Sequence, residues 1–172
     1  MTKAKSLRVG LISDTHGLVR PEARAFLQGC ERIVHGGDIG SSEVLAQLLE
    51  LAPVSAVRGN NDSGPWARRL PETEMVKLGA IHLYVIHNLA ELDLDPQAAG
   101  VRVVMAGHSH HPAASERDGV LYVNPGSAGP RRFRLPVSAG ELRIEGDRIS
   151  ARVVDLLAQN AVLAWLPSPR SP

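Results

Sequence analysis

The sequence has a single cysteine, Cys30, among its 172 residues. One cysteine excludes an internal disulfide and any metal site built from several thiolates. We expect Cys30 to be a buried thiol at a helix end without a catalytic role. Aromatic residues are scarce as well, at 3% of the chain. That scarcity leaves no row of rings on which single-stranded nucleic acid would stack.

A charge of one sign and long hydrophobic runs are also missing. Lys and Arg number 19 against 18 Asp and Glu, a net charge of +1, so charge indicates neither long nucleic acid nor an anionic membrane as a partner. No apolar run reaches the roughly 18 residues of a membrane span. The first run, 7–12, is also shorter than the core of most export signals, about 7–15 residues. We therefore expect a cytoplasmic protein, and a homo-oligomer stays an open alternative.

The overall composition is that of a folded protein. Hydrophobic residues make up 44% and charged residues 22%, as in ordinary globular chains. The length suits about one domain. We predict a single domain over 1–166 and a disordered tail over 167–172, where the sequence reads PSPRSP.

Short apolar runs alternate with helical patterns in the first third of the chain. Pro21 opens one predicted helix, and Ser41 or Ser42 caps a second that extends to Leu51. This order predicts a parallel sheet. Later segments pair around turn residues and predict hairpins, whereas 93–100 is predicted as a weak helix or a loop. The predicted strands are 7–13, 33–37, 54–57, 72–78, 81–86, 101–106, 113–117, 120–123, 138–144 and 148–154.

Seven histidines, more than all the Phe, Trp and Tyr residues together, are the unusual feature. Four of them fall at predicted strand ends, beside carboxylates and a carboxamide, and ligands bind beyond the carboxyl ends of strands in α/β sheets. These residue types are ligands of divalent metals. Taken singly, each motif could be only a polar turn or a helix cap. Together they are difficult to explain as turns. They are Asp14-x-His16, Gly37-Asp38, Gly59-Asn60, His87 and Gly107-His108-x-His110.

This series of motifs resembles the calcineurin-like metallophosphoesterases. The segment Asn124-Pro125-Gly126-Ser127 narrows the resemblance to the small bacterial and archaeal phosphodiesterase branch, which includes the retromer's metallophosphoesterase-like subunit. The resemblance covers about 7–154. It implies an α/β fold, a four-layer α/β/β/α sandwich of two mixed β-sheets flanked by helices.

The resemblance also implies two divalent metal ions. Mn is the first expectation, and Fe, Co, Ni or Zn would suit the same mixed N/O ligands. The first ion would be held by Asp14, His16 and His110, the second by Asn60, His87 and His108, with Asp38 bridging both. A metal-bridging hydroxide would then attack the phosphorus of a small or nucleotide-like phosphodiester.

One position departs from the family pattern. Many relatives have a histidine, usually read as the general acid, directly after the metal-binding asparagine. Here Asn61 follows Asn60, and asparagine cannot act as an acid. Asn60 and Asn61 are the catalytic candidates, with Asn61 limited to hydrogen bonding. Asp62, His111 and Arg131 are candidates for substrate binding, against the alternatives of a solvated loop and ordinary surface side chains.

Several neighbouring residues have simpler interpretations. His35 is expected to be packed and to orient Asp38 through hydrogen bonds. Asn124 is taken as structural first. Any of three arginines after the Asn-Pro-Gly-Ser segment, Arg131, Arg132 or Arg134, could reach a phosphate.

Four functions compete for this sequence. The leading hypothesis is a metal-dependent phosphodiesterase that acts on a small molecule. A non-catalytic protein-binding scaffold is the alternative from another class, although a scaffold need not keep a full ligand set. A nuclease ranks lower because charge and aromatic content do not favour nucleic acid as a partner. A protein phosphatase would need a larger recognition surface.

Overall fold

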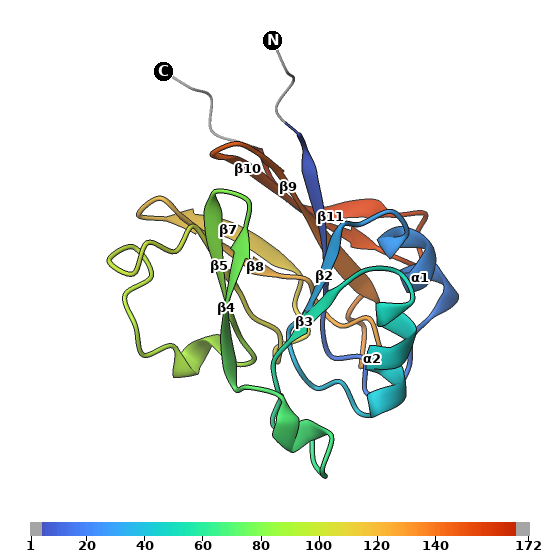
Figure 1. The fold of residues 1–172 in the computed structure, drawn as a ribbon. Helices are drawn as coiled ribbons and strands as arrows, with labels where there is room; N and C mark the ends of the chain where they lie inside the picture. The colour runs from blue at the N-terminus through green and yellow to red at the C-terminus, as the bar shows by residue number, and fades with distance from the viewer. Residues whose placement is uncertain (1–4, 168–172) are drawn as a thin grey trace.

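The computed structural model describes residues 5–167 and consists of two packed β-sheets with two α-helices against one of them (Figure 1). The first sheet has the strand order β11-β10-β9-β1-β2-β3, and the second has the order β4-β5-β6-β8-β7. The first sheet and its helices comprise β1 (Leu7–Ile12), α1 (Pro21–Leu27), β2 (Arg32–His35), α2 (Ser42–Leu49), β3 (Val54–Ala56), β9 (Ser138–Glu145), β10 (Arg148–Asp155) and β11 (Ala161–Leu166). The second comprises β4 (Thr73–Leu78), β5 (Ile81–Ile86), β6 (Val103–Met105), β7 (Ala113–Arg117) and β8 (Val120–Asn124).

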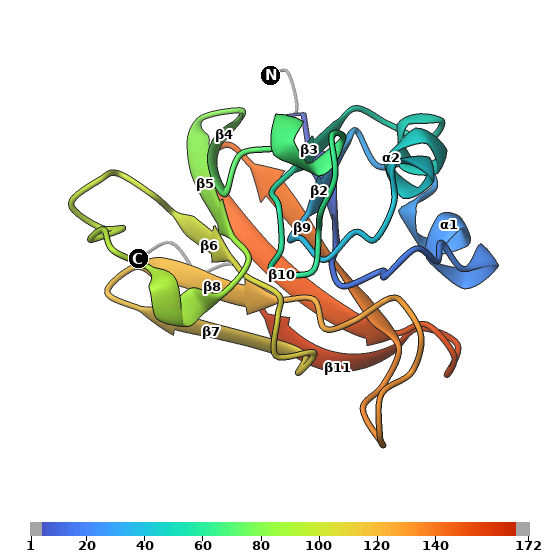
Figure 2. The same cartoon turned by 90° about the horizontal axis from the view of Figure 1, so that it is seen from below.

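The first third of the chain folds as its pattern predicts. Strands β1, β2 and β3 are parallel, and α1 and α2 lie together on the side of the molecule away from β7 and β8 (Figure 2). Pro21 is the first residue of α1. Leu27 of that helix contacts the space where a Cβ of Gly10 would lie, so glycine lets helix and strand approach closely. Ser41 occupies the N-cap position of α2, but its side chain makes no capping hydrogen bond.

Three apolar clusters hold the layers together. The central cluster lies between the sheets and draws on both, for example Leu11 and Leu142 from one and Leu83 and Met105 from the other. A second joins the helices to the first sheet, and a third lies on the outer face of the second sheet. The predicted sandwich of two mixed sheets is confirmed. Its outer layer over the second sheet is thin, because loop residues such as Leu92 and Leu94, which follow the 3-10 turn η2 (Leu89–Glu91), pack there in place of an α-helix.

Strand β11 is absent from the prediction. Its segment, AVLAWL, lacks the alternation of polar and apolar residues that marks a half-buried strand. It pairs antiparallel with β10 after a turn in which Gln159 and Asn160 have positive φ. Segment 93–100 forms turns, as the loop alternative predicted. Except for Pro167, the predicted tail lies outside the described residues. Within 5–167, no helix is long and apolar enough to cross a membrane.

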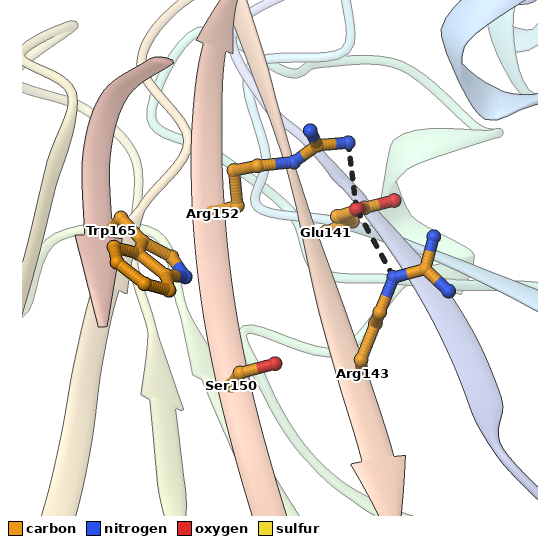
Figure 3. Close-up of a pocket in the computed structure, with 5 residues that line it drawn as sticks. All are labelled: Glu141, Arg143, Ser150, Arg152 and Trp165. Carbon is orange, nitrogen blue, oxygen red and sulfur yellow. Dashed lines mark ion pairs between the residues drawn. The ribbon is translucent and has the colours of Figure 1, made fainter. Parts of the chain in front are cut away.

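The outer face of β9 and β10 carries a buried carboxylate that is surrounded by arginines (Figure 3). Glu141 is 3% exposed. It pairs with Arg8, with Arg152 at 2.8 Å and with Arg143 at 3.5 Å. Burial raises the pKa of Glu141, but these arginines together bring it below its usual value. Trp165, which is 63% exposed, borders the same hollow. Trp165 is therefore largely exposed, whereas Trp66 is partly buried against the second apolar cluster.

Candidate metal centre

The polar strand ends meet at one edge of the molecule, where parallel strands of both sheets end. Hydrogen bonds between main-chain atoms tie the loops together: Asp14 N–H donates to Gly37 O at 3.0 Å and His16 N–H to Asp38 O at 3.0 Å. Gly107 N–H similarly donates to His87 O at 3.0 Å. These bonds join the loop after β1 to the loop after β2, and the loop after β6 to the loop after β5. His108 N–H connects the two pairs, since it donates to Asp14 Oδ2 at 3.1 Å.

One half of the cluster contains three predicted ligands of the first metal. A ligand atom from each of Asp14, His16 and His110 lies within 4.8 Å of the other two. His110 Nε2 is 3.2 Å from Asp14 Oδ1. Asp38 Oδ2 lies 4.0 Å from His16 Nε2. The spacing leaves these atoms around a common point, as three ligands of one ion require.

The other half gathers around the side-chain oxygen of Asn60. His87 Nε2 is 3.0 Å and His108 Nδ1 is 3.2 Å from Asn60 Oδ1. His87 Nε2 is also 3.5 Å from Asp38 Oδ2. Asp38 thus has an imidazole from each half near the same carboxylate oxygen. All seven predicted metal ligands are brought together. A ligand atom from each of Asp14, Asp38 and His87 also lies within 4.8 Å of the other two, so Asp14 as well as Asp38 is close to both halves.

The donor atoms fit divalent cations. Asp14 is fully buried, and its Oδ1 has no hydrogen-bond partner among the described residues; the same is true of His16 Nε2. Burial is the main reason that the pKa of Asp14 is raised, since a charged carboxylate is costly to bury without a cation. Burial also lowers the pKa of His16 and His110, which favours the neutral imidazole that binds metals.

Asp38 is the most anionic group of the cluster. Burial raises its pKa, but hydrogen bonds from His87 and Asn61 outweigh burial and lower it well below its usual range. Burial in turn lowers the pKa of His87, and Asp38 together with the Gly36 carbonyl raises it overall. His87 Nδ1 is 2.7 Å from Gly36 O. That contact identifies Nδ1 as the protonated nitrogen and leaves Nε2 as the atom that could bind a metal.

Five of the seven predicted ligands have left-handed backbone conformations. The φ angles are 54° at Asp14, 46° at His16, 53° at Asp38, 66° at His108 and 60° at His110. Such angles are uncommon outside glycine, and they cluster at functional sites where the fold imposes them. Asp and His adopt such angles more readily than most other residues, but the sequence does not show at which positions they occur.

Glycines at the strand ends make room for these side chains. A Cβ on Gly107 would lie 2.5 Å from Asp14 Oδ2, and one on Gly59 would collide with the Asp38 carboxylate. Real Cβ atoms do not approach other atoms so closely, so substitution at either glycine would displace a carboxylate of the cluster.

The remaining candidate residues have varied surroundings. Asn61 donates to Asp38 from its main-chain N–H at 2.9 Å and from Nδ2 at 2.8 Å. Asp62 is buried, which corrects the expectation of a solvated loop residue. Its carboxylate accepts hydrogen bonds from Gly59 N–H and Gly40 N–H, each at 2.9 Å. Asn61 therefore orients the carboxylate of Asp38, and Asp62 braces the loop that carries Asn60.

The two other substrate-binding candidates lie on the surface. His111 is exposed, and its Nδ1 is 2.7 Å from Ser109 O. Arg131 is exposed and donates from Nε to Leu135 O at 3.1 Å, so it braces its own turn. Its neighbour Arg132 contributes positive charge that lowers the pKa of both His16 and His110, after the larger effect of burial on each. Sequence alone could not distinguish three arginines in one loop. Arg132 is the one whose charge acts on these two histidines, and Arg131 stays a prediction as a substrate-binding residue.

Buried hydrogen bonds link the loops behind the cluster. His35 Nδ1 accepts from Gly37 N–H at 3.1 Å, and His35 Nε2 is 3.0 Å from Thr15 Oγ1. The hydroxyl of Thr15 donates in turn to Ile39 O at 2.9 Å. His35 is packed, as expected, but it contacts Thr15 and Gly37 rather than Asp38. Burial and the charge of His87 lower the pKa of His35 to about 3.

Asn124 is structural, as expected. Its Nδ2 donates to Gly107 O at 2.9 Å and to Ser109 Oγ at 3.0 Å, and its Oδ1 accepts from Gly126 N–H at 2.9 Å. The side chain thereby fixes the loop that carries His108 and His110.

Comparison with known proteins identifies the class to which this fold and cluster belong. Residues 7–147 match the model of the calcineurin-like phosphoesterase superfamily domain. The chain belongs to this superfamily.

Individual relatives agree with the predicted branch. A probable metallophosphoesterase of Methanothermobacter thermautotrophicus is 35% identical over 158 residues, which are 85% of this chain and 91% of that protein. The phosphodiesterase YfcE of Escherichia coli K12 is 29% identical over 166 residues, covering 79% of this chain and 87% of that protein. Vacuolar protein sorting 29 of Cryptosporidium parvum superposes with a TM-score of 0.79, 97% and 99% coverage of the two chains and 21% identity, a likeness of fold alone.

Proposed function

We propose that the protein is a binuclear metal-dependent phosphodiesterase that acts on a small phosphodiester. The observation that carries the proposal is the convergence of the seven side chains, with two buried donor atoms, Asp14 Oδ1 and His16 Nε2, that lack hydrogen-bond partners among the described residues. The names of the relatives support phosphoesterase chemistry.

Each residue of the cluster has a proposed part. One ion is held by Asp14, His16 and His110, the other by Asn60, His87 and His108, and Asp38 is shared. When bound, the ions supply a hydroxide near neutral pH and offset the charge that develops on the phosphoryl oxygens. Asn61 keeps Asp38 oriented and ionised through its two hydrogen bonds.

The absence of a histidine at position 61 bears on the leaving group. Asn61 donates hydrogen bonds but cannot transfer a proton to the leaving group as a general acid. The leaving oxygen must therefore depart as an anion or take its proton from water. We therefore expect activity to depend strongly on the pKa of the leaving alcohol, with phenols released faster than alkyl alcohols.

The test removes bound metal with a chelator, restores Mn²⁺ and measures hydrolysis of bis(p-nitrophenyl) phosphate beside p-nitrophenyl phosphate. We expect turnover that needs metal and favours the diester. Asp38→Ala should abolish it, whereas Asp95→Asn, a matched change at an exposed aspartate outside the cluster, should not. Monoester preference would reject the diesterase assignment, and no metal-restored turnover on either compound would reject the enzyme.

A further inference from the structure

Two cavities with different linings flank the same half of the cluster. One, of about 570 Å³, lies over β4 and β5 and includes Asn60, His87 and His108 among its lining residues. The other, of about 320 Å³, lies over β6, β8 and β7. His108 and Asn88 contribute to both cavities. A phosphorus atom beside His108 would therefore have space on two sides, as a phosphodiester with two ester arms requires.

The smaller cavity is mainly apolar, although polar side chains such as His108, His111 and Asn124 also line it. Its walls include Leu89, Val104, Ala106, Ala113 and Tyr122. No carboxylate, guanidinium or ammonium group lines it. Such a lining suits an aromatic or aliphatic ester arm, because burial of apolar surface contributes about 25 cal/mol per Å².

The larger cavity is acidic. Four carboxylates line it, from Asp62, Glu72, Glu91 and Asp93, against the single guanidinium of Arg58. Arg58 pairs with Glu72 at 2.6 Å, and the Asp62 oxygens accept main-chain hydrogen bonds. Glu91 and Asp93 form no ion pair within the described chain. These acidic side chains could act on a substrate bound at the metal centre, because the cavity that they line also includes Asn60 and His87.

The metal centre and the two cavities would each recognise a different part of the substrate. The metal centre would attract the phosphate, since two divalent ions outweigh the charges of Asp14 and Asp38. The negative cavity beside it would repel a second anionic group and attract a cation. We propose that the preferred substrate is a phosphodiester with one apolar arm and one cationic arm, such as an amino or quaternary ammonium alcohol. This inference rests on the proposed function.

The reaction would be an ordinary hydrolysis. Water adds to phosphorus, and the bond between phosphorus and the oxygen of the apolar arm breaks. That oxygen departs as an anion or takes its proton from water, which gives the free alcohol or phenol. The second product is the phosphomonoester of the cationic alcohol.

Three p-nitrophenyl phosphodiesters test the acidic cavity with the Mn²⁺-loaded full-length protein. Their second arms are choline, its uncharged isostere 3,3-dimethylbutanol, and 4-hydroxybutanoate. We expect kcat/KM to fall in that order, with about threefold to tenfold between the first two. The double variant Glu91→Gln/Asp93→Asn should bring the choline and dimethylbutyl rates together. Glu116→Gln, a matched change outside both cavities, should preserve the ratio.

A second variant tests the apolar cavity. Ala113→Trp fills it from the edge strand β7 and should lower kcat/KM for all three compounds alike without changing their ratio. Equal rates for the three compounds in the parent, or the fastest rate for the anionic arm, would overturn the inference while leaving the phosphodiesterase intact. Unchanged rates in Ala113→Trp would overturn the apolar half. No metal-dependent hydrolysis of any compound would instead reject the proposed function.

Discussion

Two buried acidic sites in this molecule handle negative charge in different ways. Glu141 sits in a regular strand among three arginines, Arg8, Arg143 and Arg152. Asp14 and Asp38 sit in left-handed turns, and their ion pairs within residues 5–167 are all with histidines. Arginine carries a permanent charge, whereas a neutral imidazole does not. Glu141 is thus neutralised by the chain itself. The histidines beside the aspartates differ, because the pKa of His87 is raised next to Asp38, whereas burial lowers the pKa of His16 and His110. We propose that metal ions supply the positive charge that the aspartates still lack.

This contrast predicts opposite effects of removing charge. Asp14→Asn should lower metal-dependent turnover by about a thousandfold or more, because one ligand of the first ion is lost. Without metal, the same substitution should leave the free energy of unfolding unchanged or raise it, because it removes a buried charge whose raised pKa marks it as unfavourable. Turnover with Mn²⁺ and urea unfolding in chelator measure the two effects. Lower stability of the variant in chelator would contradict the contrast.

At Glu141, removal of the carboxylate should lower the stability of the protein but leave its activity unchanged. Glu141→Ala leaves three arginines without their shared partner and should lower the free energy of unfolding by about 3 kcal/mol. Glu145→Gln, at an exposed position of the same strand, should change it by less than about 0.5 kcal/mol. Equal kcat values for both variants and the parent would support separation of the two sites. A large loss of turnover in the folded Glu141→Ala protein would show that the two sites are not independent.

The hydrogen bonds behind the metal cluster should make the metal-free protein sensitive to acid. Since the pKa of His35 is about 3 in the fold and about 6.5 when unfolded, the unfolded chain binds an extra proton between these values. Stability should therefore fall as pH falls from about 6.5 toward 3, by up to about 1.4 kcal/mol per pH unit from this group. Urea unfolding in chelator at several pH values gives the slope, and His35→Gln should flatten it. An unchanged slope would exclude His35 as its source.

The smallest effect concerns the arginines near the cluster. Arg132→Gln should raise KM for a phosphodiester about threefold to tenfold with little change in kcat, because its charge acts near His16 and His110. Arg131→Gln is the matched control, since Arg131 is hydrogen-bonded to Leu135 O. A larger effect at Arg131 than at Arg132 would contradict this expectation and support Arg131 as the arginine that binds the phosphate.

Much of the fold could be predicted from sequence because its signals are local. Pro21, the apolar runs and the predicted hairpin of 113–117 and 120–123 mark elements that form where expected. Strand β11 was missed because its order comes from pairing with β10 rather than from its own pattern. The ligand set came from motifs at strand ends and stays a prediction, although the structure brings its members together. The burial of Asp62 could not be predicted from sequence, because it depends on a hydrogen bond from Gly40 in a loop distant along the chain.

The proposal that seven side chains hold two ions can be tested directly by diffraction. Crystals soaked in Mn²⁺ and measured at the manganese absorption edge should show two anomalous peaks about 3.5–4 Å apart. One should lie beside Asp14, His16 and His110, the other beside Asn60, His87 and His108, with Asp38 contacting both. A single peak, or peaks that leave Asp38 without a metal, would contradict a binuclear centre.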